Sequence, residues 1–170
     1  MSSTIAYIGL GSNQGDRPAN LEKAVGELAA MPGVLLRRRA PVYETAPLGH
    51  TEQDWFLNTV VEVETTLPAR ELLERMLEIE KRLGRERGER WGPRVIDLDL
   101  LLFGTQTVME PGLSVPHPRL AERAFAVVPL ADLCPGLDLP DGGKASVLAR
   151  RLVREQRLHR YAGDTPASKV

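Results

Sequence analysis

Apolar and polar residues repeat along the chain with two periods, one typical of helices and one typical of strands. The segment 16–31 has the helical spacing i, i+3, i+4, i+7, and Pro18 lies near its start. The segment 68–84 repeats this pattern between Pro68 and Gly84, which has the position of a C-terminal cap. The apolar residues of the two segments are Leu21, Ala24, Val25 and Leu28, then Leu72, Met76, Ile79 and Leu83. Both segments are predicted to be amphipathic helices.

Strand-forming residues fill the runs between these helices. The segment 4–12 is rich in β-formers and ends in glycines and a serine, so it predicts a strand that leads into a loop. In the run 55–66, valine and threonine alternate with Glu62 and Glu64, the period-2 pattern of a half-buried strand. Further strands are predicted at 34–45 and 95–103, and an edge strand is expected at 105–109.

The resulting order, β-α-β-β-α-β, is that of the ferredoxin-like split βαβ arrangement. Residues 118–133 are predicted to add short helical and buried apolar structure, and residues 145–158 a third amphipathic helix. We therefore expect an α+β fold, a ferredoxin-like βαββαβ sandwich with an extra C-terminal helix. It is expected to form one domain over residues 1–160. Residues 161–170 are expected to be a disordered tail, because 162–170 have no apolar content that could dock.

Composition narrows the function classes. The chain has 170 residues and no apolar run near the roughly 20 residues that a membrane-spanning helix needs. Its net charge of −1 argues against a general nucleic-acid binder, which usually has a basic excess. The first residues lack the pattern of a secretory signal, and the single cysteine, Cys134, cannot form an internal disulfide. These features predict a cytoplasmic protein that binds neither membrane nor nucleic acid, and we expect a monomer.

Two aspartates interrupt the apolar run 95–103. In a strand, Asp97 and Asp99 lie on the same face, about 6.6 Å apart by the strand rise, while Ile96, Leu98 and Leu100 lie on the other. One face is then acidic and the other belongs to the core. Two neighbouring carboxylates repel each other, so the acidic face needs a cation.

Two kinds of cation could satisfy the aspartates. The first is arginine, because Arg85, Arg87, Arg90 and Arg94 precede the strand, and they would give a salt-bridged edge. The second is Mg²⁺, which proteins usually hold with one or two carboxylates and the phosphates of a substrate. Phosphates would also engage the arginines, whose guanidinium groups bind phosphate oxygens in pairs. A magnesium nucleotide therefore accounts for both the acidic and the basic part of the stretch.

Other motifs carry weaker signals. Gly9, Gly11 and Gly15 follow a strand, but their spacing, G-x-G-x-x-x-G, and the missing P-loop lysine argue against a nucleotide loop. We expect these glycines to allow a tight turn or the close approach of a neighbour. His117 lies between two prolines and is followed by Arg123; taken alone, it has the features of a surface or packing histidine.

Several segments together resemble a known family. In chain order, YIGLGSN, YETAPLG, FLNTVVEVET, RWGPRVIDLDLLLFG and VPHPRLAERAF are similar to segments of 6-hydroxymethyl-7,8-dihydropterin pyrophosphokinase, an enzyme of folate biosynthesis. The resemblance spans most of the chain, and W-G-P-R-x-x-D-L-D is its most specific motif. It implies an ATP-dependent diphosphotransferase that moves pyrophosphate from ATP to the hydroxymethyl group of the pterin and releases AMP.

The resemblance also implies roles for individual residues. Asp97 and Asp99 would hold two Mg²⁺ ions, and with Arg85 and Arg94 they form the predicted catalytic set. The other ATP-binding residues would be Glu80, Arg87, Arg90, Trp91, Leu100, Ser114, His117 and Arg123. The pterin-binding residues would be Thr45, Pro47, Leu48, Phe56, Asn58 and Phe125. The arginine-rich loop from Arg85 to Arg94 would close over ATP.

Two alternatives from other function classes stay open at this stage. A ferredoxin-like RNA-binding module has the same strand order, but it should carry an aromatic-rich strand of the RNP1 type, and no predicted strand has one. A non-catalytic metal or nucleotide sensor would bind ATP without releasing AMP. The general base also stays open, since either Asp97 or water could accept the proton of the pterin hydroxyl.

Overall fold

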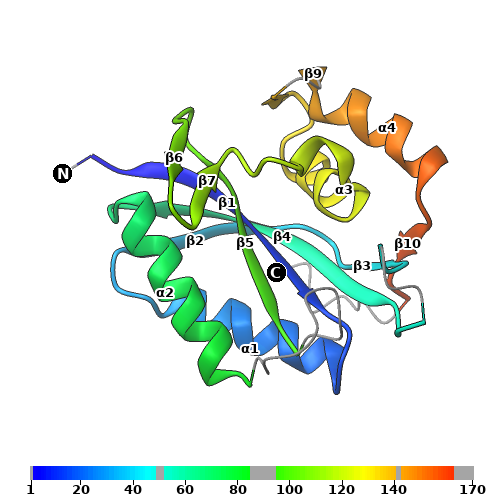
Figure 1. The fold of residues 1–170 in the computed structure, drawn as a ribbon, viewed down its shortest axis with the longest axis horizontal. Helices are drawn as coiled ribbons and strands as arrows, with labels where there is room; N and C mark the ends of the chain where they lie inside the picture. Colours follow the sequence, from blue (N-terminus) through cyan, green and yellow to red (C-terminus); the bar gives the residue numbers. More distant parts are fainter. Residues whose placement is uncertain (1, 49–51, 85–94, 141–142, 163–170) are drawn as a thin grey trace.

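A computed structural model describes residues 2–48, 52–84, 95–140 and 143–162 of the chain. Within these residues a six-stranded sheet has the order β10-β3-β4-β1-β5, and β2 also pairs with β4 (Figure 1). All pairs in this sheet are antiparallel. The strands are β1 (Thr4–Ser12), β2 (Val34–Arg39), β3 (Tyr43–Thr45), β4 (Phe56–Thr65), β5 (Asp97–Phe103) and β10 (Leu158–Arg160). The α-helices in the described ranges are α1 (Arg17–Ala29), α2 (Ala69–Arg82), α3 (Ala124–Leu133) and α4 (Ala145–Glu155). The predicted combination of helices with an antiparallel sheet is confirmed.

The helices α1 and α2 pack on one face of the sheet (Figure 1). Asp16 caps α1, because its Oδ1 accepts the N–H of Ala19 at 3.2 Å. The predicted apolar residues are buried in α1 (Leu21, Ala24, Val25 and Leu28) and in α2 (Leu72, Met76 and Ile79). The last residue of the second predicted stripe, Leu83, follows α2 and is only partly buried. Full burial of one such large apolar side chain contributes about 1.5–3 kcal/mol. The two stripes therefore decide how these helices dock on the sheet.

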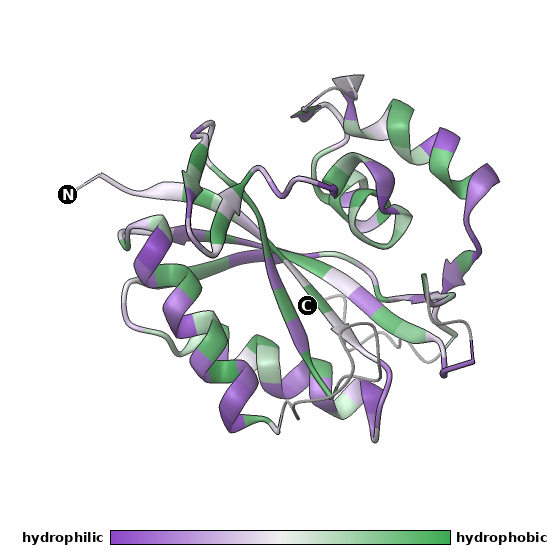
Figure 2. Ribbon diagram, viewed as in Figure 1, coloured by the Kyte–Doolittle hydropathy of each residue, from purple (hydrophilic) through white to green (hydrophobic). Residues whose placement is uncertain are grey.

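The helices α3 and α4 pack on the opposite face of the sheet and cover only part of it (Figure 1). Seven of the ten residues of α3 are buried, and the helix is mostly green in Figure 2, as expected for a helix that contacts both the sheet and α4. Its core partners on the sheet include Tyr7, Val60, Leu101 and Leu102. At the other end of this face the strands carry a set of residues that we call the polar end of the sheet: Thr45, Phe56, Asn58, Asp97 and Asp99.

The predicted half-buried pattern of β4 is wrong for Glu62. The alternating apolar positions are buried as expected, but Glu62 is buried too, with 8% of its surface exposed. Tyr7 Oη donates to Glu62 Oε1 at 3.2 Å, and Arg38 Nη2 donates to the same oxygen at 2.5 Å. Because β4 lies inside the sheet with helices on both faces, its second face is packed and not solvated.

The chain after β5 differs from the prediction in two places. Residues 105–109 are expected to form an edge strand; the strand found there, β6 (Val108–Glu110), begins three residues later and pairs only with β7 (Leu113–Val115), in a separate hairpin. The predicted helix 145–158 ends at Glu155, and the chain continues into β10, which pairs with β3. A 3-10 turn, η1 (Leu120–Glu122), precedes α3, and a short pair, β8 (Asp138–Leu139) and β9 (Gly143–Lys144), precedes α4.

Two further points concern the ends of the chain and its helices. Tyr161, at the start of the predicted tail, donates its N–H to the carbonyl of Val42 at 2.9 Å. Residues 163–170 of that tail lie outside the described residues. Among the helices that the structure describes, none has the length and apolar character needed to cross a membrane.

Candidate active site

The strand β5 directs both aspartates to the polar end of the sheet. Asp97 pairs with Gly11 of β1, and Asp99 pairs with Gly9; both aspartates are partly exposed. The neighbouring Leu98 is buried in the core with α1 and α2. The predicted division of β5 into an acidic face and a core face is therefore confirmed. Because both partners on β1 are glycines, that strand places no side chain beside the two carboxylates.

Glu80 anchors the backbone of β5 from the end of α2. Its Oε2 accepts the N–H of Leu98 at 2.6 Å, and the residue is only 2% exposed. A hydrogen bond contributes about 0.5–1.5 kcal/mol net. Leu98 lies between Asp97 and Asp99, so this bond fixes the part of the strand that presents both carboxylates. Glu80, which the resemblance assigns to the ATP site, is thus joined to the strand that carries the acidic pair.

Arg123 supplies positive charge at the polar end. Its Nη1 lies 3.9 Å from Asp99 Oδ2, and its guanidinium carbon lies 5.4 Å from the centre of the Phe125 ring. Arg123 is the N-cap residue of α3 and has extended backbone angles, φ −114° and ψ 101°. The start of α3 therefore brings a cation and an aromatic ring next to the carboxylates of β5.

His117 reaches the same region from the loop before η1. Its backbone N–H donates to the carbonyl of Leu101 at 2.9 Å, which joins this loop to β5. Its Nδ1 accepts the N–H of Arg119 at 3.2 Å, so the ring proton lies on Nε2. Burial, and then the nearby charge of Arg123, lower the pKa of His117 to about 4, so the ring is neutral at pH 7 and Nε2 is a donor. Ser114, another predicted ATP-binding residue, is partly exposed on β7.

Asn58 is the central polar side chain on the predicted pterin side. It is 7% exposed, its Oδ1 accepts the Thr45 hydroxyl at 2.6 Å, and its Nδ2 donates to the Leu10 carbonyl at 3.3 Å. It lies across from Gly11, where a Cβ would be 2.6 Å from Asn58 Nδ2 and 3.6 Å from the ring of Phe56. Gly11 therefore allows the close approach of a neighbour, as predicted. Beyond these two bonds, an amide has a second N–H and a second lone pair to offer a ligand.

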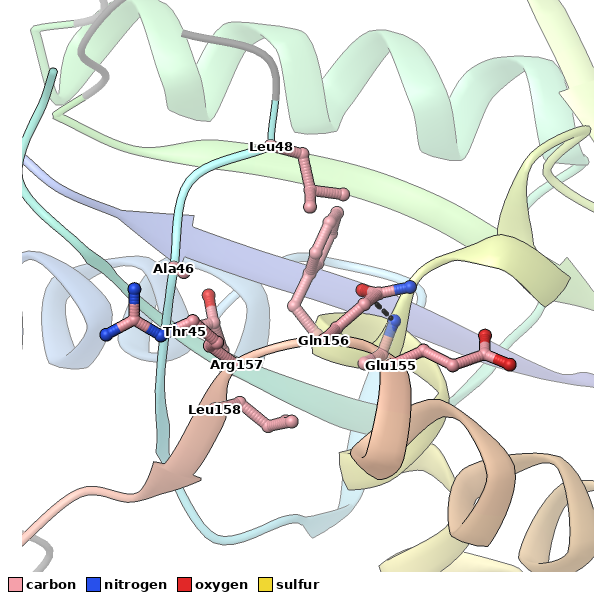
Figure 3. A pocket seen from close by; sticks show the side chains of 9 residues that line it. Thr45, Ala46, Leu48, Glu155, Gln156, Arg157 and Leu158 are labelled. Atoms are coloured by element: carbon pink, nitrogen blue, oxygen red, sulfur yellow. Dashed lines mark hydrogen bonds between the residues drawn. The ribbon is translucent and has the colours of Figure 1, made fainter. Parts of the chain in front are cut away.

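A cavity of about 190 Å³ opens beside these residues (Figure 3). Three of the predicted pterin-binding residues line it: Thr45, Leu48 and Phe125. The segment after α4 also lines it, with Gln156, Arg157 and Leu158. Phe56 pairs with Thr45 at the start of β4, and Pro47 is buried. The structure thus brings the predicted pterin-binding residues from β3, β4 and α3 to one region.

Several side chains that shape this region are not predicted by the sequence patterns. Asn13 Nδ2 donates to the Asp54 carbonyl at 3.0 Å, and Arg17 Nη1 donates to the Trp55 carbonyl at 2.9 Å, so both hold the segment that leads into β4. Gln156 hydrogen-bonds the start of α3. Asn13 belongs to the YIGLGSN segment, which could have drawn attention to it, whereas no local pattern marks Gln156.

The structure describes the predicted metal ligands but not the predicted clamp residues. The clamp residues Arg85, Arg87, Arg90, Trp91 and Arg94 lie outside the described residues. In the part of the chain that the structure describes, no group of three or more His, Cys, Asp or Glu side chains could hold a metal ion. Asp97 and Asp99 therefore form a carboxylate pair and not a complete metal cage. Such a pair is typical of Mg²⁺ sites in which substrate phosphates supply other ligands.

Known proteins with similar sequences come from one family. The family model described as 7,8-dihydro-6-hydroxymethylpterin-pyrophosphokinase matches residues 7–135. A 2-amino-4-hydroxy-6-hydroxymethyldihydropteridine pyrophosphokinase of Methylorubrum extorquens is 50% identical over 141 residues, which are 83% of this chain and 88% of that protein. A Bacillus subtilis protein of the same name is 48% identical over 132 residues, which are 78% of this chain and 79% of that protein.

A solved structure is similar in fold. The Plasmodium falciparum HPPK-DHPS structure with pteroate has a TM-score of 0.72 and covers 91% of this chain at 14% sequence identity. This chain spans 45% of that longer chain, and at this identity the likeness concerns the fold alone. The family match and the two close sequence relatives show that this chain belongs to the 7,8-dihydro-6-hydroxymethylpterin-pyrophosphokinase family.

Proposed function

We propose that the chain transfers the β,γ-pyrophosphate of ATP to the hydroxymethyl oxygen of 6-hydroxymethyl-7,8-dihydropterin at the polar end of the sheet. Membership of the family makes it a pyrophosphokinase that acts on hydroxymethyldihydropterin in folate biosynthesis. The hydroxymethyl oxygen bonds to the β-phosphorus and loses its proton, the bond from that phosphorus to the α-phosphate oxygen breaks, and AMP leaves. The observation that carries the proposal is one sheet face that presents a carboxylate pair, Asp97 and Asp99, together with a fixed amide, Asn58.

The pterin is proposed to bind at Asn58 and the two phenylalanines. Its flat ring suits the aromatic faces of Phe56 and Phe125. Its edge presents donors and acceptors that suit the Asn58 side chain. Because Thr45 and the Leu10 carbonyl already hold this amide, little rotational freedom is lost when the ligand binds. The remaining residues proposed to line the site are Thr45, Pro47 and Leu48.

The triphosphate is proposed to lie between Arg123, His117 and the arginine-rich segment. Arg123 carries its charge beside Asp99, and a guanidinium binds phosphate oxygens in pairs. His117 is neutral at pH 7 and can donate from Nε2 to a phosphate oxygen. The other residues proposed to contact ATP are Glu80, Arg85, Arg87, Arg90, Trp91, Arg94, Leu100 and Ser114.

Asp97 and Asp99 are the residues proposed to hold Mg²⁺, with two ions as the resemblance implies. A carboxylate pair suits Mg²⁺, which usually keeps several waters and takes substrate phosphates as ligands. When bound, the ions would neutralise negative charge on the triphosphate. The chain's own contribution is orientation, because Glu80 fixes the backbone between the aspartates and the glycines of β1 leave the space beside them open.

Incubation of the protein with 6-hydroxymethyl-7,8-dihydropterin, ATP and Mg²⁺, followed by chromatography of the nucleotides, tests the proposal. Equal amounts of AMP and pterin diphosphate are expected. Release of ADP would instead indicate an ordinary phosphokinase. Binding of ATP without release of AMP would indicate a non-catalytic nucleotide sensor. An Asp97→Asn variant is the matched control, since it should keep the pterin-binding residues and release little AMP.

The strand order also supports a finer description of the fold. If β2 and β3 are taken as one interrupted strand, the order from β5 through β1 and β4 to that strand is the one expected of a ferredoxin-like βαββαβ unit. In this description α3, α4 and β10 are additions to the unit. A single domain and a monomer remain part of the proposal, and light scattering after size-exclusion chromatography would test the monomer.

A further inference from the structure

The segment after α4 lies outside residues 7–135, which match the family model, yet it lines the cavity beside the proposed site. Gln156 Oε1 accepts the N–H of Ala124 at 3.1 Å (Figure 3). Gln156 Nε2 donates to the Glu122 carbonyl at 2.6 Å. These two bonds hold the backbone on both sides of Arg123. A single side chain, 32 residues beyond Ala124, therefore grips the start of α3.

The start of α3 needs this contact because the helix has no cap from its own end. Arg123 is the N-cap residue, and its side chain makes no capping hydrogen bond. Its guanidinium lies instead near Asp99, at 3.9 Å. The first N–H groups of a helix have no partner inside the helix, and leaving one unpaired in a buried place is costly. An arginine side chain has no acceptor for a helix N–H, so Gln156 supplies the acceptor for the N–H of Ala124.

Gln156 is itself held in place by its neighbours. Its N–H donates to the Leu152 carbonyl at 2.9 Å at the end of α4. The Arg157 carbonyl accepts the N–H of Ala46 at 2.9 Å, and Leu158 pairs with Thr45 where β10 joins β3. The backbone is thus fixed on both sides of Gln156, so its amide can hold Arg123 in one position.

We infer that Gln156 is a positioning residue that sets the place of the Arg123 guanidinium in the nucleotide site. The inference rests on the proposed function, in which Arg123 contacts the triphosphate. A displacement of about 1 Å in such a group can lower a rate by as much as ~100-fold. Gln156 touches no substrate in this role, and its loss should weaken the use of ATP only through Arg123.

A double-mutant cycle tests the inference with the variants Gln156→Ala, Arg123→Ala and their combination. Gln156→Ala is expected to lower kcat/KM for ATP by about tenfold or more in the wild-type background. When Arg123 is already alanine, the further loss should be less than about twofold. The Kd of a non-hydrolysable ATP analogue should follow the same ranking. Gln106→Ala is the matched control, since Gln106 is exposed in the turn after β5, and it should behave as wild type.

The possible outcomes distinguish a positioning role of Gln156 from a purely structural one. An equal loss in both backgrounds, or no loss in the wild-type background, would overturn the positioning role. If Gln156→Ala does not fold, Gln156→Met replaces it, because methionine keeps the size of the side chain and removes both hydrogen bonds. If neither variant folds, Gln156 is purely structural and the inference is wrong. A wild-type protein that releases no AMP would refute the proposed function instead, while the Kd of the analogue would still test Gln156.

Discussion

Gly11→Ala is expected to weaken pterin binding and to leave the fold intact. A Cβ at Gly11 would lie 2.6 Å from Asn58 Nδ2, closer than two such atoms can approach. The obstructing atom is the end of a side chain, so the Asn58 amide can rotate away while the backbone of β1 stays in place. The rotation would break the hydrogen bond from Thr45, at 2.6 Å, and the bond to the Leu10 carbonyl, at 3.3 Å.

The size of the effect follows from the bonds that are lost. A neutral hydrogen bond contributes about 0.5–1.5 kcal/mol net, so the free energy of unfolding should fall by about 1–3 kcal/mol. The contacts from Asn58 to the pterin should be worth a similar amount, and their loss should raise the Kd of the pterin by roughly 5- to 150-fold. The Kd of an ATP analogue should change by less than about twofold, since Asn58 is not part of the proposed nucleotide site.

Gly9→Ala is the matched control for this experiment. Gly9 also faces the polar side of β1, but a Cβ there would lie 3.5 Å from Leu101 Cδ1, an ordinary contact. Calorimetric titration with the pterin, in the presence of a saturating ATP analogue and Mg²⁺, gives the Kd, and urea unfolding gives the stability. Gly9→Ala should bind the pterin as wild type does and gain up to about 1 kcal/mol in stability. An unchanged Kd in Gly11→Ala, or an equal loss in Gly9→Ala, would refute the reasoning.

Three further predictions concern charge and burial. Asp97→Asn or Asp99→Asn should lower kcat/KM by at least about 100-fold, roughly 3 kcal/mol, without lowering the melting temperature of the ligand-free protein; activity within a few fold of wild type would mean that neither holds a metal. The pKa of His117 in the folded protein, about 4, lies below the ordinary value of 6.5, so the free energy of unfolding of the ligand-free protein should fall by about 1–2 kcal/mol as the pH drops from 6.5 to 4. In His117→Asn, the free energy of unfolding measured with urea should fall less between pH 6.5 and 4. An unchanged dependence of this free energy on pH would contradict the lowered pKa of His117. Tyr7→Phe should cost about 1 kcal/mol of stability, because it deletes the buried hydrogen bond to Glu62, and should leave kcat/KM unchanged, since Tyr7 packs in the core with α3; a large loss of activity would contradict this purely structural role.

The helices packed on the first face could be predicted because their signals are local. The apolar residues of α1 recur with the helical period, Pro18 lies near its start, and Gly84 follows the end of α2. The predicted segments 16–31 and 68–84 therefore differ from α1 and α2 by only one or two residues at each end. The face of β5 that carries Asp97 and Asp99 could be predicted for the same reason, since the side-chain period of a strand is two.

The features that could not be predicted depend on partners that are far away in the sequence. The polarity of Glu62 predicts an exposed position, but Arg38 and Tyr7 reach it across the sheet, and α3 covers that face. β10 follows a helix without a turn signal, and it forms a strand because β3 offers it an edge. The contact between Gln156 and the start of α3 has the same origin. The roles of the individual site residues stay predictions, since they depend on ligands.

A β-bulge explains why two aspartates stand in a run that is otherwise so apolar. Tyr7 pairs with Leu102, and Ile8 pairs with Leu100, so Leu101 is an extra residue in β5. Before the bulge, the aspartates alternate with core leucines. At the bulge, Leu101 and Leu102 both enter the core with α3, and Phe103 returns to the core with α1 and α2. Both faces of β5 are therefore apolar where α3 covers the strand, and one face is acidic where that cover is absent.

The helix α3, which covers part of β5 with apolar side chains, also carries residues of the proposed site at its start. α3 starts at Ala124, directly after Arg123, and Phe125 follows in its first turn. The backbone on both sides of Arg123 is held by Gln156, and the guanidinium lies 3.9 Å from Asp99. A shift at the start of α3 would therefore move the arginine and the aromatic ring together, relative to β5, whose backbone between the two aspartates is held by Glu80 from the other face. If Arg123 binds the triphosphate and Phe125 binds the pterin, as proposed, a change at the start of α3 should alter the binding of both substrates.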